Sequence, residues 1–299
     1  MEVHSITPTL KLIALQPGIP GYDRFFGAYV FRGERNAIVD VGPATALPSL
    51  ITALADLGLS PTEIDYIVLT HIHIDHSGGV GAAVRQMGRA KVVAHSRARP
   101  HLIDPTRLWE ASLKTLGDLA TRYGTVEPVP EDRIVSAADN MKLDLGGGVE
   151  LDVILTPGHA SHHLSLFDST NSVLIAGEAA GVCIDGTIRV STPPPFAFEG
   201  ALSSIDRLIA LGPEKVCYAH FGCYDNGPDL LNLAKERLVS WHNAVAIATK
   251  AGKTPDEIFA ALKREDRSLD YLATLDQDAY AREYKMLVNS IVGLSGQVL

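Results

Sequence analysis

The sequence is poor in cysteine, with only Cys183, Cys217 and Cys223 among its 299 residues. No two of them have the C-x-x-C spacing of a zinc ribbon, and an odd count does not suit a framework of disulfides. We therefore expect three free, partly buried thiols and a chain that works in a reducing compartment.

Long apolar runs and clusters of basic residues are also lacking. No stretch approaches the ~20 apolar residues that span a bilayer, and the first residues do not resemble a signal peptide. The formal net charge is −9, and no group of lysines and arginines suits a phosphate backbone. The sequence predicts a soluble cytoplasmic protein that binds neither membranes nor nucleic acid.

What the chain does have is 46% hydrophobic residues, enough for a sizeable core. Apolar runs rich in Val, Ile and Leu predict strands at Leu10–Leu15, Gly27–Arg32, Ala37–Val41, Tyr66–Thr70, Lys91–Ala94, Glu150–Leu155, His163–Phe167, Ser172–Ala176 and Lys215–Tyr218. Amphipathic spacing predicts helices at Ala44–Leu57, Val80–Met87, Thr106–Tyr123 and Gly200–Leu211. Ser60-Pro61-Thr62-Glu63 is typical of the start of one short helical turn.

The composition changes near Asn226-Gly227-Pro228, a turn-forming break after which the chain is almost wholly helical. The predicted helices beyond it are Asp229–Ala251, Pro255–Arg264 and Asp278–Leu294. We predict a mixed α/β domain over residues 1–225 and a helical extension over residues 226–299. The first helix of the extension has one apolar face, which either packs on the body or contributes to a homodimer.

A dense group of metal-binding residue types follows the predicted buried strand that ends at Thr70. His71, His73, Asp75 and His76 lie within six residues of each other. Imidazole and carboxylate are the ligands of zinc, iron and manganese. His71 and His73 point the same way while the chain is extended, and Asp75 and His76 can then aim elsewhere. One short loop can therefore serve two adjacent ions.

Further residues of the same types lie where later strands meet loops. Pro157-Gly158 ends one strand and throws His159 clear of the sheet, and His220 ends a late apolar run. Glu178 directly follows another apolar strand. Sites are commonly assembled from loops on a rigid scaffold, and a metal supplies the charge that so many titratable groups require. The pattern predicts a metal site rather than a solvated histidine-rich loop.

His71-Ile-His73-Ile-Asp75-His76 resembles the HxHxDH motif of the metallo-β-lactamase superfamily. Similar later elements of that family follow in the same order, namely Thr156-Pro157-Gly158-His159, Gly177-Glu178 and Ala219-His220. The resemblance covers about the first 225 residues and implies an αββα sandwich with the metals on loops at one edge. It also implies two divalent ions, zinc by expectation, with iron or manganese as alternatives. By this resemblance His71, His73 and His159 would hold the first ion, Asp75, His76 and His220 the second, and the acidic residue after Gly177 would bridge them.

The chain departs from the family pattern at Glu178, where an aspartate is usual. Glutamate is one methylene longer, so it can still bridge or ligate while the spacing of the ions or the filling of the second site changes. A single bound metal is therefore an open alternative to two.

Other residues near the motifs have expected supporting roles. Asp40 ends an apolar run, and it is either a residue that orients a ligand imidazole or a turn former. Asp75 is the candidate catalytic residue, which accepts the proton of the attacking water. His162 and His163 lead into a strand and are predicted to be structural or to lie at the rim of the site.

The expected function is that of a metal-dependent hydrolase, which activates a metal-bound water to cleave a small ester or thioester. The stretch after Thr156 and the helical tail are similar to the glyoxalase II-like branch of the superfamily, which cleaves thioesters. Tyr22, Phe25 and Phe196 are candidates to line an apolar pocket for a small-molecule substrate. The alternatives are lactone or phosphodiester hydrolysis, a mononuclear iron persulfide dioxygenase, and a fold reused without catalysis.

Overall fold

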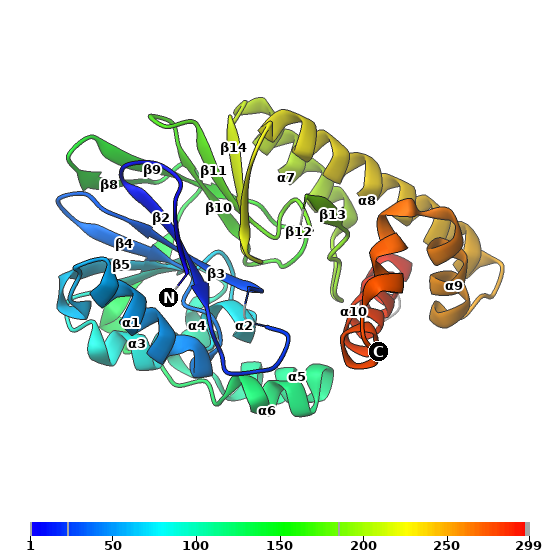
Figure 1. Ribbon diagram of the computed structural model, residues 1–299, viewed down its shortest axis with the longest axis horizontal. Helices are drawn as coiled ribbons and strands as arrows, with labels where there is room; N and C mark the ends of the chain where they lie inside the picture. The colour runs from blue at the N-terminus through cyan, green and yellow to red at the C-terminus, as the bar shows by residue number, and fades with distance from the viewer. Residues whose placement is uncertain (1, 23, 185, 297–299) are drawn as a thin grey trace.

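The computed structural model describes residues 2–22, 24–184 and 186–296. Within them two β-sheets pack face to face, helices cover both outer faces, and further helices lie at one end (Figure 1). The strands are β1 (Val3–Ser5), β2 (Leu10–Leu15), β3 (Phe26–Phe31), β4 (Asn36–Val39), β5 (Ile64–Val68), β6 (Lys91–His95), β7 (Ile134–Ala137), β8 (Lys142–Gly146), β9 (Val149–Leu155), β10 (Leu164–Asp168), β11 (Val173–Gly177), β12 (Val182–Ile184), β13 (Thr187–Arg189), β14 (Lys215–Tyr218) and β15 (Gly222–Asp225).

The helices pack outside the sheets and beyond them. They are α1 (Leu47–Asp56), α2 (Ile74–Ser77), α3 (Val80–Gln86), α4 (Arg99–Ile103), α5 (Thr106–Leu116), α6 (Asp118–Tyr123), α7 (Phe198–Ala210), α8 (Gly227–Lys250), α9 (Pro255–Glu265) and α10 (Gln277–Ser295). Short 3-10 helices lie at Ala44–Ala46, Pro61–Glu63, Glu131–Arg133 and Arg267–Thr274. The turn after Ser60 is confirmed, because the Ser60 hydroxyl accepts from the backbone of Thr62 and the Glu63 carboxylate accepts from the backbone of Ser60.

The strand order brings several loops to one edge of the sandwich. In the described residues the first sheet runs β1-β2-β3-β4-β5-β6-β7, and the second runs β15-β14-β11-β10-β9-β8. Strands β4 and β5 are parallel, as are β11 and β14, so the carboxyl ends of each pair meet at a common edge. Asp40 and the loop from Thr70 follow the first pair, and Glu178 and His220 follow the second.

Apolar side chains pack between the layers of sheets and helices. One cluster lies between the two sheets and includes Tyr29, Val68 and Leu166. A second cluster joins the first sheet to α1 and α3, and a third joins the second sheet to α7 and α8. The chain is therefore an αββα sandwich, and the predicted fold is confirmed.

Several elements differ from the sequence prediction. The single helix predicted over Thr106–Tyr123 is wrong, because Gly117 adopts a φ of 58° and divides the segment into α5 and α6. A positive φ suits glycine and interrupts a right-handed helix. Strands β1, β7, β8, β12, β13 and β15 were not predicted, since they are short and carry no long apolar run.

The C-terminal helices pack on the body of the protein. Asn226, with a φ of 62°, precedes α8, and the buried face of α8 includes Ala234, Leu238 and Trp241. These helices share one apolar cluster with α7 and with Val190 of the loop after β13. The expectation that the apolar face of α8 packs on the body is confirmed. Among the described residues, the helices are all too short or too polar to cross a membrane.

Candidate metal centre

The loop after β5 is held by its backbone and by Asp40. The Asp40 carboxylate accepts hydrogen bonds from the Thr70 backbone at 2.8 Å and from the Thr70 hydroxyl at 2.7 Å. The His76 carbonyl accepts from the backbone of Val41 and Gly42, both at 3.0 Å. These hydrogen bonds hold the loop of His71, His73 and His76 against the end of β4, and Asp40 accepts two of them.

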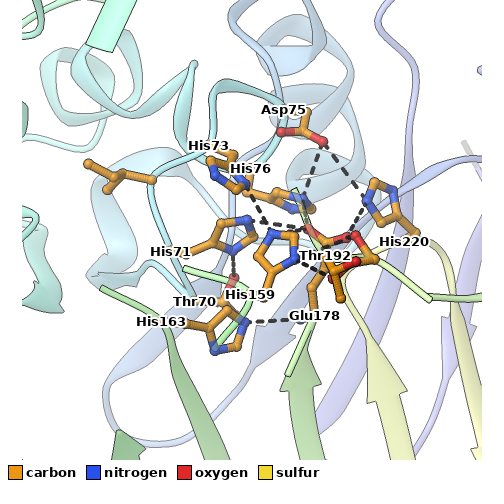
Figure 2. Close-up of polar contacts among 12 residues, drawn as sticks. Thr70, His71, His73, Asp75, His76, His159, His163, Glu178, Thr192 and His220 are labelled. Atoms are coloured by element: carbon orange, nitrogen blue, oxygen red, sulfur yellow. Dashed lines mark hydrogen bonds and ion pairs between the residues drawn. The ribbon is translucent and has the colours of Figure 1, made fainter. Parts of the chain in front are cut away.

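The structure brings together all seven sequence-predicted ligands. They form two groups, within each of which the candidate ligand atoms lie within 4.8 Å of one another. The first group is His71, His73, His159 and Glu178, and the second is Asp75, His76 and His220. Figure 2 shows the imidazoles turned toward a common centre, with Asp75 reaching His76 and His220 from one side.

Glu178 lies at the centre of both groups. Its carboxylate is 3.0 Å from His159 Nε2, 3.3 Å from His71 Nε2 and from His220 Nε2, and 3.4 Å from His76 Nε2. The side chain is only 4% exposed. The extra methylene of glutamate therefore carries the carboxylate into the middle of four imidazoles.

The ring nitrogens that face this centre are of two kinds, and two of them, His159 Nε2 and His73 Nδ1, form a hydrogen bond with each other at 3.1 Å. His71 Nε2 and His76 Nε2 are buried and have no hydrogen-bond partner in the described structure. Thr70 gives its hydroxyl proton to Asp40, so it accepts from His71 Nδ1 at 3.1 Å and leaves His71 Nε2 with a lone pair. His159 Nδ1 similarly donates to the carbonyl of Ser191 at 3.1 Å. Buried polar atoms without partners are costly, and a metal ion bound by these nitrogens would remove that cost.

The electrostatics of the centre divide the histidines into two kinds. Burial lowers the pKa of His71 well below its usual value and that of His73 to about 3. Burial also acts to lower the pKa of His76, but the carboxylates of Asp75, Glu178 and Asp40 outweigh it and raise that pKa. The pKa of His159 is also raised, because the Glu178 carboxylate outweighs the effect of burial, which by itself would lower it. These are the responses expected where imidazoles compete for carboxylates in a buried site.

The candidate substrate residues lie at different distances from this centre. The Phe25 ring is 4.3 Å from the His220 ring, and Tyr22, which is 4% exposed, packs 5.2 Å from Phe25. Phe196 is half-buried and lines a small cavity that reaches His159 and Glu178. Phe25 therefore touches a predicted ligand, whereas Tyr22 stands one ring further away.

The residues that support the ligands include several that sequence reasoning missed. Ser191 donates its hydroxyl to Glu178 Oε1 at 3.0 Å, and His163 accepts the backbone N–H of Glu178 at 3.0 Å. Thr70 orients His71 as described above. Ser191 and His163 act on a ligand more than ten residues away in the sequence, and neither residue type by itself reveals such a contact.

The comparisons agree with this geometry. The family model of the metallo-beta-lactamase superfamily matches residues 28–220. The metallo-beta-lactamase fold-containing protein ST1585 of Sulfurisphaera tokodaii is 32% identical over 220 residues, which is 72% of this chain and 80% of that protein. A hydroxyacylglutathione hydrolase of Albidiferax ferrireducens is 30% identical over 64% of this chain and 60% of its own length.

Solved structures show the same fold. The structure of ST1585 from Sulfolobus tokodaii superposes with a TM-score of 0.72 at 26% identity, covering 97% of this chain and 100% of that one. The metallo-beta-lactamase family protein TTHA1429 from Thermus thermophilus gives a TM-score of 0.71 at 23% identity, covering 97% and 93%. The family and the residue groups together support divalent metal binding and a metal-dependent hydrolase in general. The matched region includes strands β4 to β11, strand β14 and all the candidate ligands, and the chain belongs to the metallo-beta-lactamase superfamily.

Proposed function

We propose that the protein hydrolyses small esters or thioesters with the help of two divalent metal ions, zinc being the expected one. The observation that carries this proposal is the convergence of four buried imidazoles on the Glu178 carboxylate at 3.0–3.4 Å. A purely structural cluster would satisfy its ring nitrogens with hydrogen bonds, but His71 Nε2 and His76 Nε2 make none among the described residues and face only the carboxylates of Glu178 and Asp75 at 3.3–3.4 Å.

The metal ions would be held by the two residue groups, with Glu178 shared between them. When bound, such ions lower the pKa of water and stabilise the charge that grows on a carbonyl oxygen. The chain itself orients the imidazoles through Thr70 and Ser191. Asp75 is the residue we assign as proton acceptor, since its side chain is 21% exposed and can exchange protons with solvent.

The surroundings of the second group favour a small acyl substrate. Phe25 presents an apolar ring beside His220, and Tyr22 lies behind it. The Arg282 guanidinium, which α10 contributes, lies 5.2 Å from the centre of the Tyr22 ring. We place the acyl group against Phe25 and a negatively charged part of the substrate toward Arg282, with Phe196 as a second wall. The relative named hydroxyacylglutathione hydrolase makes a glutathione thioester the first substrate to test.

The test is a comparison of initial rates on a glutathione thioester, an acyl lactone, an activated phosphodiester and glutathione persulfide. Each is measured with zinc, manganese or iron(II), and the His73→Ala variant serves as control. We expect thioester or ester hydrolysis that the variant loses. Oxygen uptake with persulfide on iron alone, without hydrolysis of any substrate, would instead assign the protein to the dioxygenases. Hydrolysis confined to the phosphodiester or the lactone would overturn the proposed substrate class but not the metal-dependent reaction.

A further inference from the structure

Two of the three cysteines face each other directly across the last hairpin of the second sheet. Cys217 of β14 pairs with Cys223 of β15 in the antiparallel register, and their sulfur atoms are 2.9 Å apart. Both thiols are free, and Cys183 lies elsewhere. The two sulfur atoms therefore lie in direct contact, and no bond joins them.

The backbone geometry suits a covalent bond between them. Residues directly opposite in an antiparallel pair have Cα atoms about 4.5–5.5 Å apart. Disulfides span Cα separations of about 4.4–6.8 Å and have a bond of about 2.05 Å. The sulfurs would therefore move less than about 1 Å to bond, which side-chain rotation together with a small shift of the two strands can supply.

The two thiols are exposed to different degrees, as a reactive pair requires. Cys217 is fully buried, and burial raises the pKa of its thiol. Cys223 is partly exposed and lines a surface groove together with Arg24 and Phe221. A small oxidant from solvent can reach Cys223, and Cys217 stands behind it as the resolving thiol.

The pair also lies at the base of a turn that carries a predicted metal ligand. His220 is midway between Cys217 and Cys223 in the sequence, at the tip of the same hairpin. The Tyr29 hydroxyl contacts the carbonyl of Tyr218 at 2.7 Å and that of Gly222 at 2.8 Å, one on each side of the turn. The two strands therefore hold the turn of His220 from both sides, and a new bond between them would act on that turn.

We propose that Cys217 and Cys223 are a reversible oxidation site, in which a peroxide converts the two thiols to a disulfide that displaces His220 and weakens metal binding. Cys223 attacks the peroxide, so that an S–O bond forms, the O–O bond breaks and the leaving oxygen departs as water. Cys217 then attacks the Cys223 sulfur, so that the S–S bond forms and the second oxygen leaves as water with the last thiol proton. Both sulfurs are oxidised, one peroxide is reduced to two waters, and a dithiol reductant reverses the change.

The first test is chemical and does not depend on the reaction proposed above. The full-length protein is treated with hydrogen peroxide, desalted, blocked with an alkylating reagent and digested without reduction. A chymotryptic cut after Tyr218 or Phe221 separates the two cysteines, so the fragments stay joined only by a disulfide. We expect the linked fragments in the wild type and in the Cys183→Ser control, and their loss on reduction. Peroxide treatment that leaves both thiols alkylatable, or that links Cys183 instead, would overturn the proposal.

The second test asks whether the disulfide reaches the metal site. Oxidised and re-reduced samples of Cys183→Ser are stripped with a chelator and titrated with manganese(II), which prefers oxygen and imidazole ligands to thiols. We expect at least several-fold weaker binding in the oxidised sample and recovery after reduction, with no such difference in Cys183→Ser/Cys223→Ser. Equal affinity in the oxidised and reduced samples would refute the link to His220.

Discussion

The imidazole of His163 accepts the backbone N–H of Glu178 through Nε2, at 3.0 Å (Figure 2). Since Nε2 accepts, Nδ1 carries the proton and donates to the Thr156 hydroxyl at 2.8 Å. That hydroxyl donates onward to Ser165 at 3.0 Å, and Ser165 donates to the carbonyl of Ala176 at 3.0 Å. The chain of hydrogen bonds fixes His163 as a neutral tautomer and fixes the backbone that aims Glu178 at the metal site.

The His163→Ala variant should therefore bind metal more weakly while keeping its fold. Residues that orient metal ligands typically contribute a factor of about 10–100 in metal affinity. The unpaired backbone N–H of Glu178 would also cost about 1–3 kcal/mol of stability. The matched control is His162→Ala, because the His162 ring lies beside the same histidines, 6.0 Å from the His73 ring, but makes a hydrogen bond with the backbone of Ile72 at 3.5 Å and not with Glu178. Equal metal affinities for the two variants would show that His163 does not position Glu178.

Gly177 is the second residue on which this arrangement depends. It adopts a φ of 60°, and a Cβ atom there would lie 2.5 Å from His163 Nε2. Gly177→Ala should destabilise the fold by more than the ~1–2 kcal/mol that the left-handed conformation alone costs an alanine. Gly212→Ala is the control, since Gly212 has a φ of 61° with nothing within 4 Å. Unfolding in denaturant measures the free energy of unfolding of both variants. Equal decreases would show that the contact with His163 does not contribute to the cost of Gly177→Ala.

The parts of the site that could be predicted from the sequence are those whose chemistry is local. His71, His73, Asp75 and His76 share one short loop, so their residue types alone indicated a metal. The role of His163 depends on a strand pairing with β11 and on a backbone N–H that no residue type reveals. It was predicted to be structural or at the rim, and its hydrogen bonds show that it supports a predicted ligand.

The same distinction applies to the fold. The layered α/β architecture follows from buried apolar runs, which are long and easily recognised. Strand β15 was not predicted, because Gly222–Asp225 becomes a strand only by pairing with β14. The break at Gly117 was missed because the amphipathic pattern continues across it, while the backbone conformation of a single glycine decides the geometry.

Replacing Glu178 by glutamine tests its central place. The substitution keeps the shape of the side chain but removes the charge that four imidazoles face at 3.0–3.4 Å. We expect metal content after dialysis to fall and any hydrolytic rate to drop by about 100-fold or more, the scale on which loss of charge stabilisation acts in catalysis. Metal analysis together with circular dichroism distinguishes loss of metal from unfolding. The control is Glu199→Gln, which changes an exposed glutamate of α7. Full metal retention in Glu178→Gln would contradict a ligand role for the carboxylate.

Metal binding should release protons near neutral pH. In the metal-free protein, Asp75, Glu178 and Asp40 overcome burial and raise the pKa of His76, and Glu178 does the same for His159. These two imidazoles hold a proton more tightly than an ordinary histidine does, and a metal must displace it, whereas the lowered pKa values of His71 and His73 favour their neutral forms. Metal affinity must therefore fall as the pH is lowered. Calorimetric titrations in buffers of different ionisation enthalpy count the protons, and heats independent of the buffer would contradict the assignment.

The C-terminal extension should support the metal site through Gly293 of α10. The Thr192 hydroxyl donates to the carbonyl of Ser290 at 2.9 Å, and a Cβ on Gly293 would meet the carbonyl oxygen of Thr192 within 1.9 Å. Thr192 follows Ser191, whose hydroxyl and carbonyl hold Glu178 and His159. Alanine normally favours a helix over glycine by about 1 kcal/mol, so Gly293→Ala would stabilise α10 if the helix stood alone.

In this protein the opposite is expected, because the added methyl group pushes the loop that carries Ser191 away from the site. Gly293→Ala should bind metal several-fold more weakly and unfold at lower denaturant concentration. Gly200→Ala is the matched control, a glycine within α7 whose added Cβ would make only a 3.4 Å contact. If both variants bind metal as the wild type does, α10 merely covers the loop; if only Gly293→Ala loses affinity, the helical extension is part of what holds Glu178 and His159 in place.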